Sequence, residues 1–255
     1  MPKRARRRRY TKSTGPTASR LLISIAGIAV VAILVLAAGW WFFVRSDAKL
    51  ATGPPAIPED LIDASDAPGA DGDGTDLLTF RIIADRSEAA YFVGEQLASL
   101  SIPSTASGTT GDVGGEFHLT PDGTALAADT TSQFTIGLTS LRSDESIRDN
   151  RVQGALETGL FPTATFTFTS FTGYDPSIPE GEQQDIRLTG TLDLHGVQRE
   201  VTWKVEALRQ ANVITALATV TIAFADYGIT PPSVGGFTLV GNDATLQVQL
   251  VAETI

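Results

Sequence analysis

Residues 186–205, IRLTGTLDLHGVQREVTWKV, alternate apolar and polar side chains on either side of a His-Gly pair. Side chains of a β-strand point in turn to its two faces, so a period of two is typical of strands with one buried face. His195 and Gly196 interrupt the alternation, and they are predicted to form the turn between two strands. We therefore interpret His195 as a turn residue and not as a base or a ligand.

The same alternation recurs through residues 78–255, for example in residues 134–138 and 246–250, with turn-forming Pro, Gly and Asp between the runs. Residues 143–158 are the exception, because their Ser-Asp-Glu start and the spacing of their apolar residues favour a helix. We therefore predict an all-β domain over residues 78–255, an antiparallel barrel or sandwich of about eight strands with one short helix.

The N-terminal segment has the charge pattern of a membrane anchor. Residues 1–20 carry eight Lys or Arg and no acid, and Leu21–Val44 (LLISIAGIAVVAILVLAAGWWFFV) carries no charge. About 20 apolar residues span a bilayer as a helix, and positive charge stays on the cytoplasmic side. We expect a single transmembrane helix that keeps the tail in the cytoplasm and places the domain outside the cell membrane. A cleaved signal peptide is the alternative, although its apolar core would be shorter.

Residues 45–77 are rich in Pro, Gly, Ala and Asp, and they contain few large apolar side chains. Such a composition buries too little surface to offset the entropy of ordering, so we predict a flexible acidic linker. The net charge of the chain is −10, and its acidic excess lies in this linker and in the domain. An acidic surface repels phosphates, so no nucleic acid partner is expected.

Signatures of catalysis and of metal binding are missing from the sequence. The chain has no cysteine and two histidines, which excludes disulfides, thiolate sites and a His-rich metal site. His118 lies between two apolar residues in a strand pattern, so alternation predicts an exposed strand histidine. No Gly-x-Ser-x-Gly or His-Glu-x-x-His motif occurs. We therefore expect that the protein is not an enzyme and requires no cofactor or metal. An enzyme that acts on lipid headgroups is the disfavoured alternative.

Alternation also predicts which side chains point into the barrel, and these are nearly all apolar. A closed sheet of about eight strands is either filled by its side chains or wide enough for one slender ligand. The candidate lipid-binding residues are Tyr91, Val93, Phe117, Phe134, Ile136, Phe166, Phe168, Leu192 and Trp203. An ordinary packed core has the same pattern, and the alternation leaves both interpretations open.

Several stretches of the domain resemble the YceI family of lipid- or polyisoprenoid-binding domains. Gly190–Val201 is similar to the strand–turn–strand pattern Gly-x-Leu-x-x-His-Gly-Val-x-x-x-Val of that family. Leu160-Phe161-Pro162 and Asp226-Tyr227-Gly228-Ile229 resemble two further elements. The resemblance extends over about Leu78 to Ala252.

The resemblance implies an extended, lipocalin-like antiparallel barrel that holds a long isoprenoid or acyl chain, with His195 as a turn position. Many members have a histidine in a strand near their start, whereas residues 89–97 (AAYFVGEQL) have none. We thus expect an anchored extracytoplasmic carrier or buffer of an isoprenoid-type lipid, whose protein partners the sequence does not name. The alternative is a solidly packed barrel that serves as an interaction or structural module of the envelope.

Overall fold

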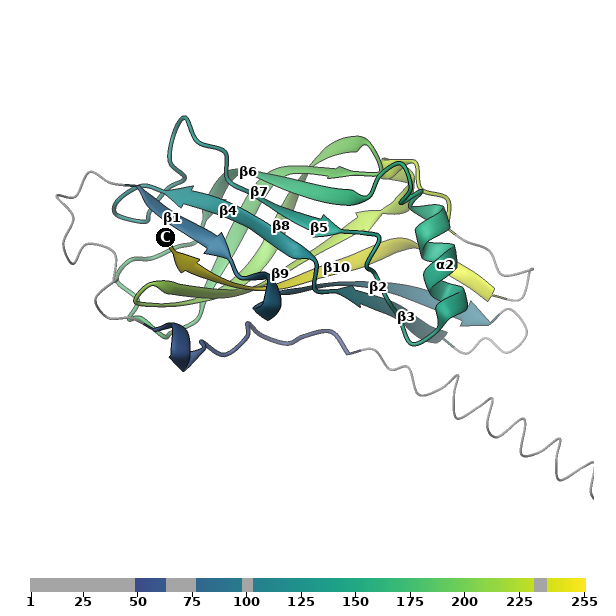
Figure 1. Ribbon diagram of the computed structural model, residues 1–255, viewed down its shortest axis with the longest axis horizontal. Coiled ribbons are helices and arrows are strands. Elements are labelled where there is room, and N and C mark those ends of the chain that lie inside the picture. The colour runs from purple at the N-terminus through teal and green to yellow at the C-terminus, as the bar shows by residue number, and fades with distance from the viewer. Residues whose placement is uncertain (1–48, 63–76, 98–102, 232–237) are drawn as a thin grey trace, which may run out of the picture. The chain divides into compact units, whose positions relative to one another are not determined.

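A computed structural model describes residues 49–62, 77–97, 103–231 and 238–255 (Figure 1). All of them belong to one compact unit, Ser46–Ile255. The predicted basic tail and transmembrane helix lie outside the described residues. Among the residues that are described, no helix is both long and apolar enough to cross a bilayer.

The described part of the chain contains ten strands, one α-helix and three short 3-10 helices. In chain order they are η1 (Glu59–Leu61), β1 (Leu78–Ile82), η3 (Ala84–Arg86), β2 (Glu88–Leu97), β3 (Pro103–Thr110), β4 (Val113–Leu119), β5 (Gln133–Gly137), α2 (Ser146–Ala155), β6 (Thr163–Thr172), β7 (Gln184–Leu194), β8 (Val197–Gln210), β9 (Val213–Ala223), η4 (Phe224–Tyr227) and β10 (Thr238–Thr254).

Eight of the strands form a closed antiparallel barrel in the order β1-β4-β5-β6-β7-β8-β9-β10, and β1 closes it by pairing with β10. The long strand β10 pairs with β2 along its first part and with β1 at its end. The hairpin of β2 and β3 therefore continues the sheet beyond the closed ring (Figure 1). The prediction of an all-β barrel of about eight strands with one helix is confirmed.

The number of strands exceeds eight because two long strands are each interrupted once, one between β1 and β2 and the other between β3 and β4. Between β1 and β2, the hydroxyl of Ser87 donates to the carbonyl of Ile83 (2.8 Å) and accepts from the amide of Val251 (3.1 Å). Between β3 and β4, the residues Gly111 and Asp112 lie outside the ladder. Each long strand is thus divided into one piece in the closed ring and one piece in its extension.

The turn predicted at His195 and Gly196 is confirmed. Leu194 pairs with Val197, which leaves two residues in the loop, and both have positive φ, 55° and 72°. Positive φ at both positions matches the twist of a two-residue hairpin. The ring of Phe161 lies against Gly196, where an added Cβ would approach within 2.6 Å of its Cε1. A larger residue at position 196 would meet both strain and a steric clash.

The predicted helix is present as α2, which is shorter than the stretch 143–158 that the pattern indicated. Its start is held by Asp149, whose carboxylate accepts from the amide (2.7 Å) and the hydroxyl (2.6 Å) of Ser143. Val152 and Leu156 pack against the core of the barrel. The residues that follow α2 contact the β7–β8 turn, as Glu157 lies 3.0 Å from His195 and Phe161 lies against Gly196. We call this end of the barrel the α2 end.

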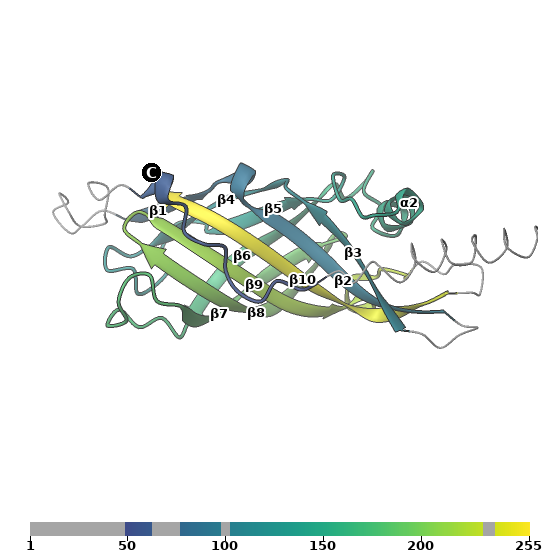
Figure 2. The same cartoon turned by 90° about the horizontal axis from the view of Figure 1, so that it is seen from below.

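Residues 49–62, which the sequence assigns to a flexible linker, are instead bound to the outside of the barrel. The side-chain amide of Gln247 accepts from the backbone N–H of Ala51 (2.9 Å) and donates to its carbonyl (3.1 Å). Farther along, Asn212 donates to the carbonyl of Leu61 (3.0 Å). Figure 2 shows this dark blue segment running beside β10. Composition failed to predict it because its contacts come from residues distant in sequence.

Candidate functional site

The structure brings all nine candidate lipid-binding residues into one apolar cluster inside the barrel. Seven are buried: Val93, Phe117, Phe134, Ile136, Phe166, Leu192 and Trp203. Tyr91 and Phe168 are partly buried and pack against the other seven. The inward direction predicted from alternation is therefore correct for these side chains. Their contact with a lipid stays a prediction.

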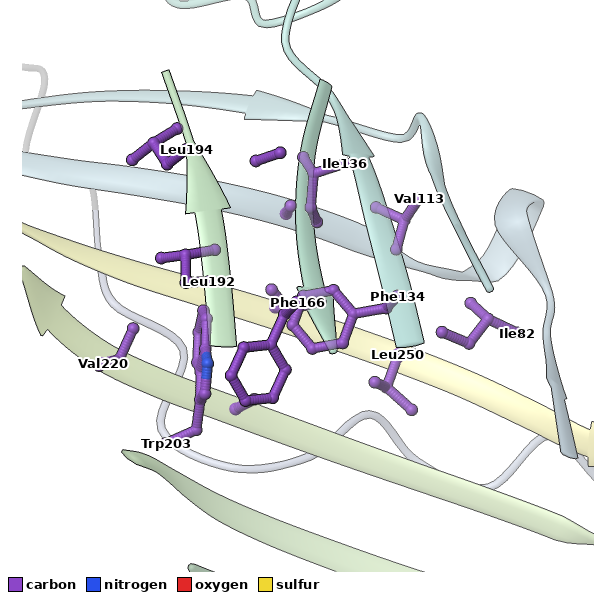
Figure 3. Packing of buried hydrophobic residues seen from close by; sticks show 14 of the residues in the cluster. Ile82, Val113, Phe134, Ile136, Phe166, Leu192, Leu194, Trp203, Val220 and Leu250 are labelled. Atoms are coloured by element: carbon purple, nitrogen blue, oxygen red, sulfur yellow. The ribbon is translucent and has the colours of Figure 1, made fainter. Parts of the chain in front are cut away.

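Aromatic rings occupy the middle of this cluster. The ring of Phe166 lies 5.3 Å from that of Phe134, 5.5 Å from that of Phe168 and 5.7 Å from that of Trp203, measured between centroids. Phe80 and Phe117 stack at 5.1 Å beside them. Figure 3 shows Phe134, Phe166 and Trp203 from different strands converging on one place. The middle of the barrel is thus filled by side chains that contact one another.

Two polar atoms are buried within this apolar interior. The indole Nε1 of Trp203 and the hydroxyl of Tyr227 have no hydrogen-bond partner among the residues that the structure describes. A buried donor without a partner is costly, so each atom is a potential contact for a ligand oxygen. Alternation could not assign Tyr227 to the interior, because it lies in the 3-10 turn η4 and not in a strand.

Two ionisable side chains of β2 lie at the α2 end of the interior. Burial raises the pKa of Tyr91 to about 12, and it also raises the pKa of Glu95 above its usual range. In both cases the charges of α2 and of the segment before it act on the group as well, with Arg148 favouring the ionised form. Alternation among the apolar residues predicts Tyr91 as an interior residue, whereas Glu95 is charged and is not among the candidates.

The raised pKa of Tyr91 predicts a late step in an alkaline titration. The ordinary pKa is 10.0, so the unfolded chain loses this proton first, and the contribution of Tyr91 to stability is complete below pH 10.0 and is lost as the pH approaches about 12. The chain has four tyrosines, and the ultraviolet absorbance of tyrosinate reports each ionisation. Tyr91→Phe is expected to remove one late component. An unchanged late component in that variant would contradict the assignment.

The two histidines lie apart and have structural partners. His118 lies on the face opposite to Phe117, as predicted, but it is partly buried and not exposed, and its Nδ1 lies 3.0 Å from the hydroxyl oxygen of Thr79. The ring of His195 bridges the carbonyl of Tyr227 and the carboxylate of Glu157, at 3.0 Å from each. The two contacts of His195 connect the β7–β8 turn to η4 and to the residues that follow α2. Within the described ranges, no group of three or more side chains is arranged to hold a metal ion.

A comparison with protein families identifies the same family that the sequence resembles. Residues 80–252 match the YceI family, which is described as the YceI-like domain. The predicted resemblance is therefore confirmed over these residues. No curated protein matches the chain.

Two of the solved structures that match the chain illustrate the fold that they share with it. A polyisoprenoid binding domain from Saccharophagus degradans, implicated in plant cell wall breakdown, matches with a TM-score of 0.55 and 19% identity, over 70% of this chain and 99% of that domain. BcnA from Burkholderia cenocepacia matches with a TM-score of 0.50 and 17% identity, over 67% of this chain and 98% of that protein. At these identities the likeness concerns the fold alone.

Proposed function

The chain belongs to the YceI-like domain family, and on this basis we propose that its barrel binds an isoprenoid or another long-chain lipid. The protein acts as a carrier or buffer, without catalysing a reaction. The segment Leu21–Val44 anchors it in the cell membrane, with the basic tail in the cytoplasm and the barrel outside. The charge pattern of residues 1–44 supports the anchor and its orientation.

The apolar character of the barrel interior is the observation that carries this proposal. None of the described buried residues is ionisable except Tyr227, and the buried polar ones are Ser87, Thr110, Ser132, Thr158, Asn212, Thr215 and Gln247. Each buried CH₂ group contributes about 0.8 kcal/mol, so a five-carbon isoprene unit contributes up to about 4 kcal/mol. A long chain can therefore bind without any charged contact.

The lipid chain is proposed to lie between the aromatic middle of the barrel and the α2 end. In this part Tyr91, Val240 and Leu246 are only partly buried, although they pack against the core. Tyr91 and Leu246 are direct partners across β2 and β10. A chain that enters here displaces Val240 and Leu246 and leaves the packed rings in place.

The proposal is tested by native mass spectrometry of the purified full chain, alone and with added geranylgeraniol. We expect one lipid molecule per chain. Leu246→Arg places a charge on the inward face and is expected to abolish the bound species. Thr221→Arg is the matched control, because Thr221 is exposed on the neighbouring strand and pairs with Thr245. A chain that stays empty and takes up no lipid would exclude the proposed function.

The contacts between the rings also favour a second candidate. If the barrel is packed along its whole length, it serves as an interaction or structural module of the envelope. In that case the unmodified chain, Leu246→Arg and Thr221→Arg would each appear only at the mass of its own lipid-free chain.

A further inference from the structure

The inward face of β2 changes from apolar to polar towards the α2 end. Ala89 and Val93 are part of the buried core, and Tyr91 packs against it. Glu95 follows at the same alternation, so it lies on the same face of the strand. Its side chain is partly buried. A carboxylate thus adjoins the part of the interior that we assign to the lipid chain.

Tyr91 is directed across the neighbouring strand towards the segment that precedes α2. Its partner in β3 is Gly108. An added Cβ on this glycine would lie 2.6 Å from Cε1 of Tyr91 and 2.9 Å from the carbonyl oxygen of Arg142. The absence of a side chain at position 108 therefore provides the room in which the phenol ring lies.

The facing side of α2 contributes Arg148. Val152 is four residues later on the same side of the helix and packs against the core, so Arg148 lies on the side that faces the barrel. The side chain of Arg148 is 18% exposed, and it forms an ion pair with Asp144. Arg148 is close enough to act electrostatically on both Tyr91 and Glu95.

Glu95 and the hydroxyl of Tyr91 have no hydrogen-bond or ion-pair partner in the described part of the chain, and neither is among the residues with further contacts. The neighbouring acids differ in this respect, because Asp144 pairs with Arg148 and Asp149 accepts from Ser143. A partly desolvated carboxylate without a donor is an unfavourable arrangement in the empty protein. A ligand that donates a hydrogen bond would relieve it.

We propose that Tyr91, Glu95 and Arg148 form the binding site for the polar headgroup of the lipid, and that this site selects an uncharged headgroup with a hydroxyl. The hydroxyl donates to the carboxylate of Glu95, while its oxygen accepts from Tyr91 or Arg148. Asp144 pairs with Arg148, and Asp149 offsets Arg151, the other cation that acts on Glu95, so Glu95 leaves the site with an excess of negative charge. A phosphate headgroup would be repelled. The inference rests on the proposed lipid binding and adds the class of headgroup.

The test compares two ligands that share one hydrocarbon chain, geranylgeraniol and geranylgeranyl phosphate, with the full chain in detergent. We expect the alcohol to bind at least about tenfold more tightly, as one charge-assisted hydrogen bond and one repulsion distinguish the two. Glu95→Gln removes the charge at constant size and is expected to abolish most of this preference. Glu88→Gln is the control, because Glu88 is exposed and lies on the opposite face of the same strand.

The outcomes separate the two proposals. If the unmodified chain binds neither ligand, lipid binding itself is wrong. If it binds both equally, or prefers the phosphate, the headgroup site is wrong while lipid binding stands. The same conclusion follows if Glu95→Gln keeps the preference. Tyr91→Phe provides a second variant, which retains the ring above Gly108 and is expected to weaken the binding of the alcohol. If Glu95→Gln fails to fold, the Tyr91→Phe variant tests the headgroup site instead. Unchanged binding of the alcohol by Tyr91→Phe would then overturn the proposal.

Discussion

Gly190→Ala is expected to destabilise the barrel strongly. Gly190 lies in the middle of β7, opposite Phe168 of β6. A Cβ at this position would be 2.2 Å from the carbonyl oxygen of Thr167 and 2.7 Å from Cζ of Phe166. The first contact is with backbone, which a change of side-chain rotamer cannot relieve. Overpacking in a core lowers the free energy of unfolding by about 1–3 kcal/mol, and we expect a decrease of about 3 kcal/mol or more.

Gly94→Ala is the matched control for this prediction. Gly94 also lies in a strand, but no heavy atom outside its neighbours lies within 4 Å of an added Cβ. A methyl group there should change the free energy of unfolding by less than about 1 kcal/mol, since it mainly restricts the unfolded chain. Urea denaturation of both variants, followed by circular dichroism, measures the difference. Similar midpoints for both variants would contradict the assigned contact.

Phe166→Ala is expected to destabilise the protein by about 3–5 kcal/mol, as is typical when a large buried aromatic side chain is removed. Phe166 is 0% exposed, and its ring contacts three other aromatic rings. The cavity left behind is bounded by groups on different strands, which limits their collapse. The fall in the urea midpoint at unchanged slope measures the loss.

Phe171→Ala serves for comparison, because Phe171 lies later in the same strand and is only partly buried. Removal of the Phe171 ring should lower the free energy of unfolding by clearly less than removal of the Phe166 ring. Equal losses in the two variants would show that the aromatic middle of the barrel is not specially stabilising. An acidic residue at position 166 would leave a buried charge, so such a variant would test folding and not lipid binding.

The local pattern of residues determined the main features of the fold. Two adjacent residues at the end of an alternating run, His195 and Gly196, predicted a turn that both adopt with positive φ. The alternation around Phe166 and Trp203 predicted the inward direction of both. These predictions hold because a strand has a period of two and a tight hairpin needs particular backbone angles, and neither depends on distant residues.

Part of the candidate site could not be predicted from local alternation or turn patterns. Glu95 was missed because a charged residue at the end of a strand gives no sign of which elements face it. Its importance comes from α2, which is 51 positions later at its start, Ser146. Tyr227 was missed because a 3-10 turn has no alternation.

The sequence by itself thus determined an all-β chain with an apolar interior, since composition and periodicity are local properties. Tertiary structure alone decided how the interior is occupied and what borders it. The rings of Phe134, Phe166 and Trp203 meet because β5, β6 and β8 curve around one axis. Residues 49–62 lie against the barrel because Gln247 and Asn212 offer amides to backbone groups far away in sequence. Contacts of this kind depend on the closed sheet, and they arise only once it has formed.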